Sequence, residues 1–491
     1  MSSGVGSTEP PSRAGAGFAG AGAEKWQPVI GLEIHVQLKT KTKMFCRCRN
    51  GFGGEPNAQT CPVCLAFPGA LPVPNRRAVE ETIKLGLALD CEIAERAVFH
   101  RKQYFYPDNP KAYQISQYDE PLCARGQLTV PTPNGEIAIG ITRAHLEEDA
   151  AKNVHVAESG RIHGATATLV DFNRCGTPLV EIVTEPDIHD AETAKRFLQL
   201  LRQTVVELGL SDAELEKGSM RFDVNVSVRP AGSDELRTRT ELKNMNSFNF
   251  AAKGIEREIA RQVRVYEEGG TVEQETLHFD PAHEESPPLR SKEEAQDYRY
   301  FPEPDLVPVQ PPREVVERLR SELGELPGSR IRRIAEMLSF YDADVLVTGG
   351  LDRLWSEVVA AGADAKEAAN VLANQFVATG IDPAAVDAAE LAKLVAARAE
   401  IPRAAFDEAL AHVGDAGFSA TPYLEQKVVA DTSALDPVIE QVIAANAAQA
   451  EQYRAGKQGL LGFFVGQVMK ETGGTADPRV VNERVREKLG A

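Results

Sequence analysis

Two residues that could bind a metal ion stand two positions apart near the start of the chain. Glu33 and His35 lie in the apolar run of residues 28–38, and residues two apart on a β-strand share one face. Glu181 lies in a second apolar run, residues 179–183, where a buried carboxylate is costly unless a cation accompanies it. These residues therefore predict a shared cation site. The alternative is that His35 is an ordinary core histidine.

A further acidic position follows the strand-like run of residues 137–141. Counted from that run, strand alternation places Glu148 on a face of small residues that leaves room for a ligand. Those residues are Ala138, Gly140, Thr142 and Ala144. Carboxylates and one imidazole suit Mg²⁺ or Mn²⁺ better than Zn²⁺, because hard cations select oxygen ligands. The candidate ligands are Glu33, His35, Glu148 and Glu181. The alternative is that the acidic triplet at 147–149 is a solvated strand end.

Four cysteines form two close pairs early in the chain. Cys46 and Cys48 are followed, after twelve residues, by Cys61 and Cys64. This spacing matches the tetrahedral thiolate coordination of a structural Zn²⁺. Three basic neighbours would offset the thiolate charge: Lys43, Arg47 and Arg49. Reduced thiols or disulfides are the alternative, and disulfides need an oxidising compartment. The other cysteines are expected to be ordinary buried thiols: Cys91, Cys123 and Cys175.

Basic and aromatic residues alternate through residues 100–118. Cations can bind phosphates while aromatic rings stack on unpaired bases, although the same composition also suits core packing with surface charge. In residues 221–229, alternation places four polar side chains on one face: Asp223, Asn225, Ser227 and Arg229. That face is either solvated or the wall of a polar cleft.

Composition limits the classes of function. The formal net charge is −18, which argues against indiscriminate nucleic-acid binding, because that affinity comes from neutralising phosphates. A nucleic-acid partner would have to bind local basic patches. The first 25 residues contain no long apolar segment, so we expect neither a secretory signal nor a membrane span, and a cytosolic (cytoplasmic) protein.

The texture of the sequence predicts an α+β protein of several domains. Residues 1–25 are expected to be a disordered extension, and residues 26–310 a mixed-sheet domain with alternating strand patterns. Prolines concentrated in residues 302–312 indicate a stiff connector. Residues 311–417 predict a helical domain, and residues 418–491 a small helical tail domain in which residues 460–469 form a buried helix.

Six longer motifs follow one another along the chain. They are VIGLEIHV (29–36), YFYPDNPKAYQISQ (104–117), ITRAHLEEDA (141–150), GTPLVEIVTEPD (176–187), ELKNMNSF (241–248) and DYRYFPEPD (297–305). Together they resemble GatB, a component of the bacterial aspartyl/glutamyl-tRNA amidotransferase GatCAB, from about Pro28 to the C-terminus. The resemblance implies a cradle-like catalytic domain, a helical domain and a YqeY-like tail domain that binds tRNA.

The resemblance also implies a reaction. ATP phosphorylates the side-chain carboxylate of Glu-tRNA(Gln) or Asp-tRNA(Asn), and ammonia from a partner glutaminase then forms the amide, which makes the assembly a glutamine-dependent carbon–nitrogen ligase. The implied cofactors are ATP, Mg²⁺ and structural Zn²⁺. The implied partners are the amidase (GatA) and the small protein (GatC) of a heterotrimer, together with misacylated tRNA. The alternative is a non-catalytic scaffold that binds tRNA in the same assembly.

Roles can be carried over residue by residue. The resemblance makes the four candidate ligands the Mg²⁺ shell and makes Glu148 and Lys102 catalytic, with Lys102 at a conduit for ammonia. It assigns phosphate or acyl contacts to Lys243, Asn244 and Arg299. The tail departs from the family pattern, since Lys457 is followed by Gln458 where a second lysine is usual. If each lysine neutralises a tRNA phosphate, the salt dependence of binding should be shallower, or Arg454 or Lys470 compensates.

Overall fold

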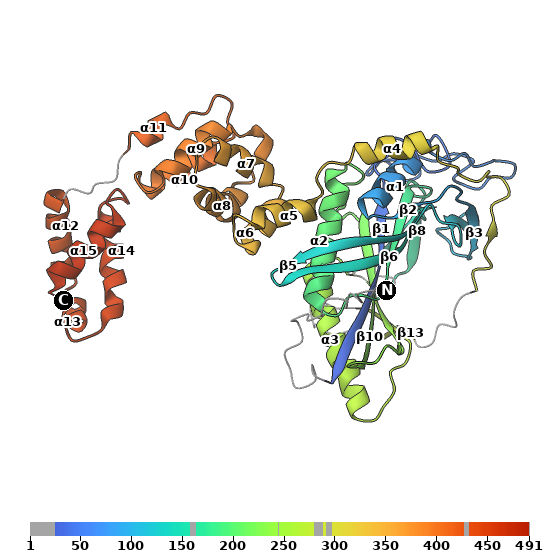
Figure 1. Ribbon diagram of the computed structural model, residues 1–491, viewed down its shortest axis with the longest axis horizontal. Coiled ribbons are helices and arrows are strands. Elements are labelled where there is room, and N and C mark those ends of the chain that lie inside the picture. Colours follow the sequence, from blue (N-terminus) through green and yellow to red (C-terminus); the bar gives the residue numbers. More distant parts are fainter. Residues whose placement is uncertain are drawn as a thin grey trace, which may run out of the picture. The chain divides into compact units, whose positions relative to one another are not determined.

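The structure, a computed structural model, describes residues 25–157, 164–243, 245–278, 288–290, 297–426 and 432–490. These residues form two compact units that divide between Ser329 and Arg330 and are described separately (Figure 1). Apart from Lys25, the predicted disordered extension lies outside the described residues. The predicted domain boundaries remain predictions.

A nine-stranded mixed sheet forms the centre of the first unit. Its strands follow in the order β13 (Pro288–Arg290), β12 (Thr276–His278), β11 (Thr240–Lys243), β10 (Met220–Pro230), β1 (Trp26–Gln37), β9 (Pro178–Thr184), β6 (Gly135–Glu148), β5 (Cys123–Thr132) and β2 (Glu92–Ile93). All neighbours are antiparallel except β11 and β12. The long strand β1 therefore lies near the middle, between β10 and β9.

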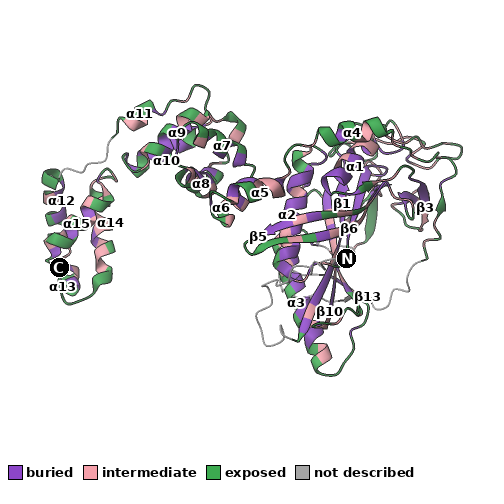
Figure 2. Cartoon of the chain, viewed as in Figure 1, coloured by how far each residue is buried: buried purple, intermediate pink, exposed green. Residues whose placement is uncertain are grey.

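The two faces of this sheet differ in character. On β1, Ile30, Leu32, Ile34 and Val36 are at most 1% exposed, and the intervening residues are half-buried. The apolar face packs against α2 (Ala191–Glu207) and α3 (Phe248–Glu267), whose buried stripes appear in Figure 2. Asp190 caps α2 by accepting a hydrogen bond from the Thr193 amide. Because alternate β1 residues are buried against the helices, the intervening side chains lie on the polar face, where they can bind a ligand.

Smaller elements lie at the edges of the first unit. A three-stranded sheet has the order β14 (Phe301–Pro302), β3 (Phe99–Gln103) and β4 (Tyr113–Gln117). Strands β7 (Lys152–Val156) and β8 (Ala167–Asp171) pair with each other in antiparallel fashion. Helix α4 (Arg313–Ser321) packs against α1 (Arg76–Ala88), with Arg318 and Glu80 3.6 Å apart. Cys64 lies in an irregular loop between β1 and α1 and is 3% exposed.

The described part of the second unit consists of helices joined by turns and loops. After α5 (Pro327–Ala335), at the junction between the units, come α6 (Phe340–Thr348), α7 (Asp352–Ala360), α8 (Ala365–Asn374), η1 (Phe376–Thr379), η2 (Pro383–Ala385), α9 (Ala388–Ala397) and α10 (Arg403–His412). The buried Trp355 donates its indole N–H to the Ala365 carbonyl at 2.9 Å.

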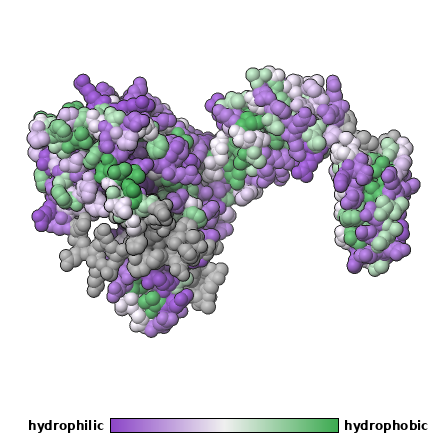
Figure 3. Space-filling view, turned by 180° about the vertical axis from the view of Figure 1, so that it is seen from behind, coloured by the Kyte–Doolittle hydropathy of each residue, from purple (hydrophilic) through white to green (hydrophobic). Residues whose placement is uncertain are grey.

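The C-terminal helices have a hydrophobic core of their own. They are α12 (Thr432–Ala445), α13 (Ala447–Arg454), η3 (Gln458–Leu460), α14 (Leu461–Glu471) and α15 (Pro478–Leu489), whereas α11 (Thr421–Leu424) contacts α10. Phe464 and Val468 of α14 are completely buried in that core. Among the described residues, no helix is both long and apolar enough to cross a bilayer. Hydrophilic residues dominate the visible surface in Figure 3. The predicted α+β class, with helical regions after the mixed-sheet domain, is confirmed.

Candidate active site

Glu33, His35 and Glu181 meet on the polar face of the large sheet. The register pairs His35 of β1 with Glu181 of β9, and Glu33 lies two residues before His35 on the same face. The Nε2 atom of His35 lies 3.5 Å from a Glu181 oxygen and 3.9 Å from a Glu33 oxygen. The predicted shared face of Glu33 and His35 is confirmed, while their role in metal binding remains a prediction.

A β-bulge decides which residues of β6 join this face. Ile141 pairs with Thr184 and Arg143 with Val183, so Thr142 is an extra residue in β6. A bulge reverses the alternation beyond it. Alternation counted from residue 137 therefore fails after Thr142.

Beyond the bulge, the polar face receives Arg143, His145 and Glu147. His145 pairs with Glu181 in the register, and Glu147 lies 3.6 Å from His35. Glu148 projects to the opposite face, where it pairs with Lys111 and accepts the Ile115 amide at 3.1 Å. The predicted placement of Glu148 beside the other candidate ligands is wrong. Glu147 takes that place.

The donor atoms form two overlapping groups. One contains Glu33, His35 and Glu181, the other His145, Glu147 and Glu181, and the ligand atoms of each group lie within 4.8 Å of one another. Glu181 belongs to both. Carboxylate oxygens with one or two imidazoles fit a hard divalent cation such as Mg²⁺ or Mn²⁺.

The charges of this cluster reinforce that fit. Burial and the charge of the nearby Glu181 together raise the pKa of Glu147 to about 7. Burial would lower the pKa of His35, but its hydrogen bond to Glu181 and the charge of Glu147 raise it to about 9. Burial lowers the pKa of His145 to about 4. The carboxylates thus create a buried site that favours positive charge.

Lys102 of β3 faces the same cluster. Burial would lower the pKa of Lys102, but the charges of Glu147 and Glu181 raise it above its usual value. Its ammonium lies 4.8 Å from the ring centroid of Tyr298. The structure therefore places Lys102 beside the candidate cation site.

The residues predicted to contact the phosphate or acyl group do not all lie at the carboxylate cluster. Lys243 of β11 forms ion pairs with Asp223 at 2.9 Å and with Glu241 at 3.1 Å, farther along the polar side of the sheet. The Arg299 side chain is 81% exposed and lies 3.9 Å from Asp297, so the structure does not bring it to the cluster. Asn244 lies outside the described residues.

Sequence reasoning missed several polar residues at this site. Arg143 donates to Glu181 at 3.3 Å, and Arg221 of β10 donates to the buried Asp149 at 3.1 Å. Gln37 donates to the same Asp149 at 2.7 Å. The polar–apolar alternation of residues 143–147 is a signal that could have identified Arg143 and His145, had it been read backwards from Glu147.

The four predicted zinc ligands also come together. The sulfur atoms of Cys46, Cys48, Cys61 and Cys64 lie within 4.8 Å of one another, and all four cysteines are free. The completely buried Lys43 brings its ammonium within 3.7 Å of the Cys64 sulfur and donates to the Phe172 carbonyl at 3.1 Å. Four clustered sulfurs beside a cation fit a tetrahedral Zn²⁺. The other cysteines are buried, as predicted: Cys91, Cys123 and Cys175.

We expect Cys61→Ser to remove zinc and to lower Tm by at least about 5 °C, because thiolate ligation contributes folding energy. ATP cleavage, the activity that the sequence resemblance implies, should persist in the folded fraction, since the thiolates are not members of the carboxylate cluster. Zinc content, thermal unfolding and ATP cleavage test this. A chelator should destabilise the native protein but not the variant. A stable, zinc-replete variant without ATP cleavage would show that the cysteines serve catalysis.

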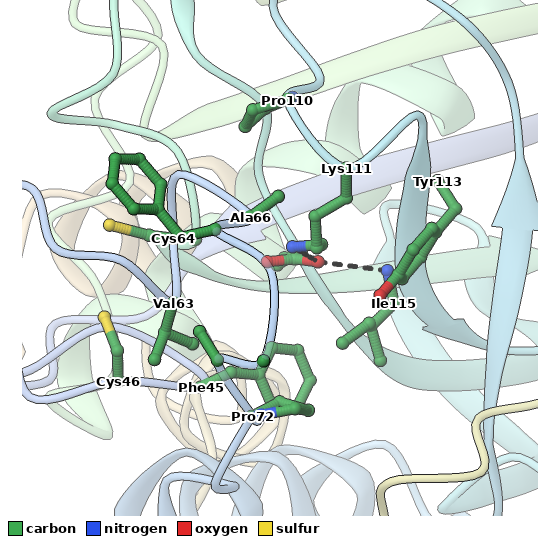
Figure 4. Close-up of a pocket in the computed structure, with 15 residues that line it drawn as sticks. Phe45, Cys46, Val63, Cys64, Ala66, Pro72, Pro110, Lys111, Tyr113 and Ile115 are labelled. Atoms are coloured by element: carbon green, nitrogen blue, oxygen red, sulfur yellow. Dashed lines mark hydrogen bonds and ion pairs between the residues drawn. The ribbon is translucent and has the colours of Figure 1, made fainter.

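A cavity of about 280 Å³ lies beside the cysteine loop (Figure 4). Cys46, Cys64, Lys111 and Tyr113 line it together with Glu148. The Lys111–Glu148 pair is buried. The adjacent residues Glu147 and Glu148 thus lie in different environments. Glu147 belongs to the carboxylate cluster on one face of β6, and Glu148 lines a cavity on the other face.

Comparisons with known proteins agree with the observed architecture. The family model of the GatB/GatE catalytic domain matches residues 28–317, and that of the GatB domain matches residues 353–489. Two similar relatives are B subunits of aspartyl/glutamyl-tRNA(Asn/Gln) amidotransferases. The one from Geobacter sulfurreducens is 48% identical, covering 94% of this chain and 99% of its own. The one from Thermobifida fusca is also 48% identical, over 95% of this chain and 94% of its own. The chain therefore belongs to the GatB family, the B subunits of aspartyl/glutamyl-tRNA amidotransferases.

Proposed function

We propose that this chain is the kinase and transamidase component of a tRNA-dependent amidotransferase. Its relatives are named for Asp/Glu-tRNA(Asn/Gln) amidotransferase, and we take misacylated Glu-tRNA(Gln) or Asp-tRNA(Asn) as its substrates. The observation that carries the proposal is the pair of overlapping carboxylate–imidazole groups that share Glu181, with Lys102 beside them.

The chemistry requires an activated carboxylate. A carboxylate oxygen is a poor leaving group, and transfer of the γ-phosphoryl group of ATP converts it into a good one. A bound Mg²⁺ would stabilise the negative charge on the phosphoryl group during its transfer. Glu33, His35, Glu147 and Glu181 would hold that cation. Lys102 and Arg143 line the same face, and they would offset negative charge on the phosphate and orient the acyl group.

Ammonia would come from a partner amidase, GatA, in an assembly with the small protein GatC. The sequence shows no Ser-rich amidase signature of its own. We propose that the cavity with the Lys111–Glu148 pair is the last part of the ammonia path. Glu148 would take a proton there from ammonium, which must be deprotonated before it can attack the activated carbonyl carbon. Lys102 marks the entry into the acyl-binding face.

A complex reconstituted with GatA and GatC tests the proposed function. With misacylated tRNA, glutamine, ATP and Mg²⁺, we expect phosphate transfer to the acyl group, followed by Gln-tRNA or Asn-tRNA. Testing both misacylated tRNAs separately identifies the substrate. A complex that binds tRNA but forms neither product would support a scaffold instead.

The C-terminal domain is the proposed site for the body of the tRNA. Lys457 donates to Gln452 at 3.1 Å, and Arg454 donates to the Leu489 carbonyl at 2.9 Å. Lys470 lies in the last turn of α14. These three cations are the candidates for phosphate contacts in the absence of the second lysine.

Deletion from Thr421 onward should raise KM for aminoacyl-tRNA by roughly tenfold or more, because binding energy remote from the reacting group is lost. Hydrolysis of glutamine by the partner amidase should continue. Steady-state kinetics of the truncated complex, at several salt concentrations, measure both effects. Unchanged KM and kcat would show that this domain does not hold tRNA.

A further inference from the structure

Two tyrosines from distant parts of the chain stack at the edge of the small sheet. Tyr118 follows β4, and Tyr300 precedes β14. Their ring centroids lie 4.3 Å apart, and the ring planes differ by 7°. This is close, parallel stacking, so the two rings act as one rigid platform.

The platform continues toward the carboxylate cluster. The ring centroids of Tyr300 and Tyr298 lie 6.0 Å apart, and the Lys102 ammonium lies 4.8 Å from the centroid of the Tyr298 ring. Burial raises the pKa of Tyr300, and the charges of Glu181 and Glu147 add to the increase. Tyr300 is thus the inner end of the stack, beside the residues proposed to act on the acyl group.

The outer end of the stack is open to solvent. Tyr118 is 55% exposed although Tyr300 covers one face of its ring. The His100 ring makes a T-shaped contact with Tyr118, with ring centroids 6.2 Å apart, and the rest of the Tyr118 surface is exposed. Burying an aromatic face is favourable, and Tyr118 leaves that surface available to a ligand. The Nε2 atom of His100 lies 3.2 Å from an oxygen of the neighbouring Asp119 carboxylate.

We propose that Tyr118 stacks on the unpaired base of the 3′-terminal nucleotide of the aminoacyl-tRNA. This inference rests on the proposed function, in which the acyl group enters the carboxylate cluster. The amino acid is esterified to the ribose of that nucleotide, so the base must lie one sugar away from the reacting group. An exposed aromatic platform suits a single-stranded end. It suits the adenine of ATP less well, because small-ligand sites bury most of their ligand.

Variants of Tyr118 in the full complex test the role of the ring. Tyr118→Leu removes the aromatic face but keeps apolar surface, whereas Tyr118→Phe keeps the ring. Loss of one base stack should raise KM for aminoacyl-tRNA roughly tenfold for Tyr118→Leu, with kcat, KM for ATP and glutamine hydrolysis little changed. Tyr118→Phe should behave as the native protein. Phe105→Leu is the matched control, since Phe105 is 91% exposed and stacks on no other ring in the described part of the chain.

A fluorescent base gives a direct readout that does not depend on turnover. Misacylated tRNA carrying 2-aminopurine at its 3′-terminal position should lose fluorescence on binding the native complex and Phe105→Leu, but not on binding Tyr118→Leu. A 2-aminopurine nucleoside triphosphate serves as the second probe. Quenching of that probe alone, with its loss in Tyr118→Leu, would assign the platform to ATP and overturn the proposal.

Equal tRNA quenching in native and Tyr118→Leu complexes would also overturn it. Failure of the proposed function looks different, because the native complex would then form no amidated tRNA while the tRNA probe could still report stacking. Thermal unfolding of each variant confirms that the compared proteins are folded.

Discussion

Glu181→Gln in the assembled complex is expected to reduce phosphate transfer from ATP to the acyl group by roughly 10²- to 10³-fold, equivalent to several kcal/mol. Glu181 is the one residue shared by both candidate cation groups. The amide preserves its shape but removes a negative charge from each group at once. The affinity of the variant complex for Mg²⁺ or Mn²⁺ should therefore fall together with the rate of phosphate transfer. Binding of tRNA should barely change, because tRNA affinity comes mainly from phosphate contacts.

Glu185→Gln provides the matched control for this experiment. Glu185 is the first residue after β9, it is exposed, and it accepts a hydrogen bond from Thr142. It belongs to neither cation group. Titration with Mn²⁺ and single-turnover transfer of labelled phosphate should distinguish the two variants. If Glu181→Gln keeps native Mn²⁺ affinity and transfer rate, the carboxylate cluster does not hold the cation.

Glu148→Gln is expected to separate the two halves of the reaction. Labelled phosphate should still reach the acyl group, because Glu148 lies outside both cation groups. Amide formation from glutamine should fall by roughly 10²-fold, since the proposed proton acceptor in the cavity is lost. Rapid-quench measurements of phosphorylated acyl-tRNA and amidated tRNA, made on the same samples, measure both steps.

The same substitution leaves the buried Lys111 ammonium without its carboxylate partner. Losing one partner of a buried pair typically costs about 3–5 kcal/mol, so thermal unfolding must accompany the kinetics. The double variant Glu148→Gln with Lys111→Met removes the unpaired charge and should recover stability without recovering amide formation. If Glu148→Gln instead abolishes phosphate transfer while it remains folded, Glu148 belongs with the metal ligands, as the sequence first suggested.

Local periodicity was enough to find the centre of the carboxylate cluster. Glu33 and His35 stand in one apolar run that forms β1, so alternation predicted their common face, and Glu181 was linked to them because a buried carboxylate in the run that forms β9 needs a cation. The cysteine cluster was equally accessible, because its four ligands lie within one loop segment. The geometry of the cysteine cluster is set by residues close together in sequence, whereas Glu181 reaches His35 only through the pairing of β1 with β9.

The rest of the site depends on contacts between distant segments. The bulge at Thr142 appears in the pairing of β6 with β9, and alternation counted forward from residue 137 misses it, although the alternation of residues 143–147 has the opposite phase. The ion pair of Lys111 with Glu148 could not be predicted from the sequence, because it depends on the loop before β4, which brings the Lys111 ammonium to the Glu148 carboxylate. Arg299 was misleading for the opposite reason: it stands in a family-like motif, but its side chain faces solvent.

The bulge in β6 makes this strand sensitive to insertions and deletions in an uneven way. Because Thr142 sets the phase of every side chain that follows, gain or loss of one residue between Thr142 and Glu148 would exchange the occupants of the two faces. His145 and Glu147 would then point away from Glu33, His35 and Glu181, which lie on the neighbouring strands. The turn at Pro133–Asn134 lies ahead of the bulge at the hairpin tip, where extra residues can loop out without inverting the strand. Length variation should therefore be tolerated at the tip of the β5–β6 hairpin and excluded at its base.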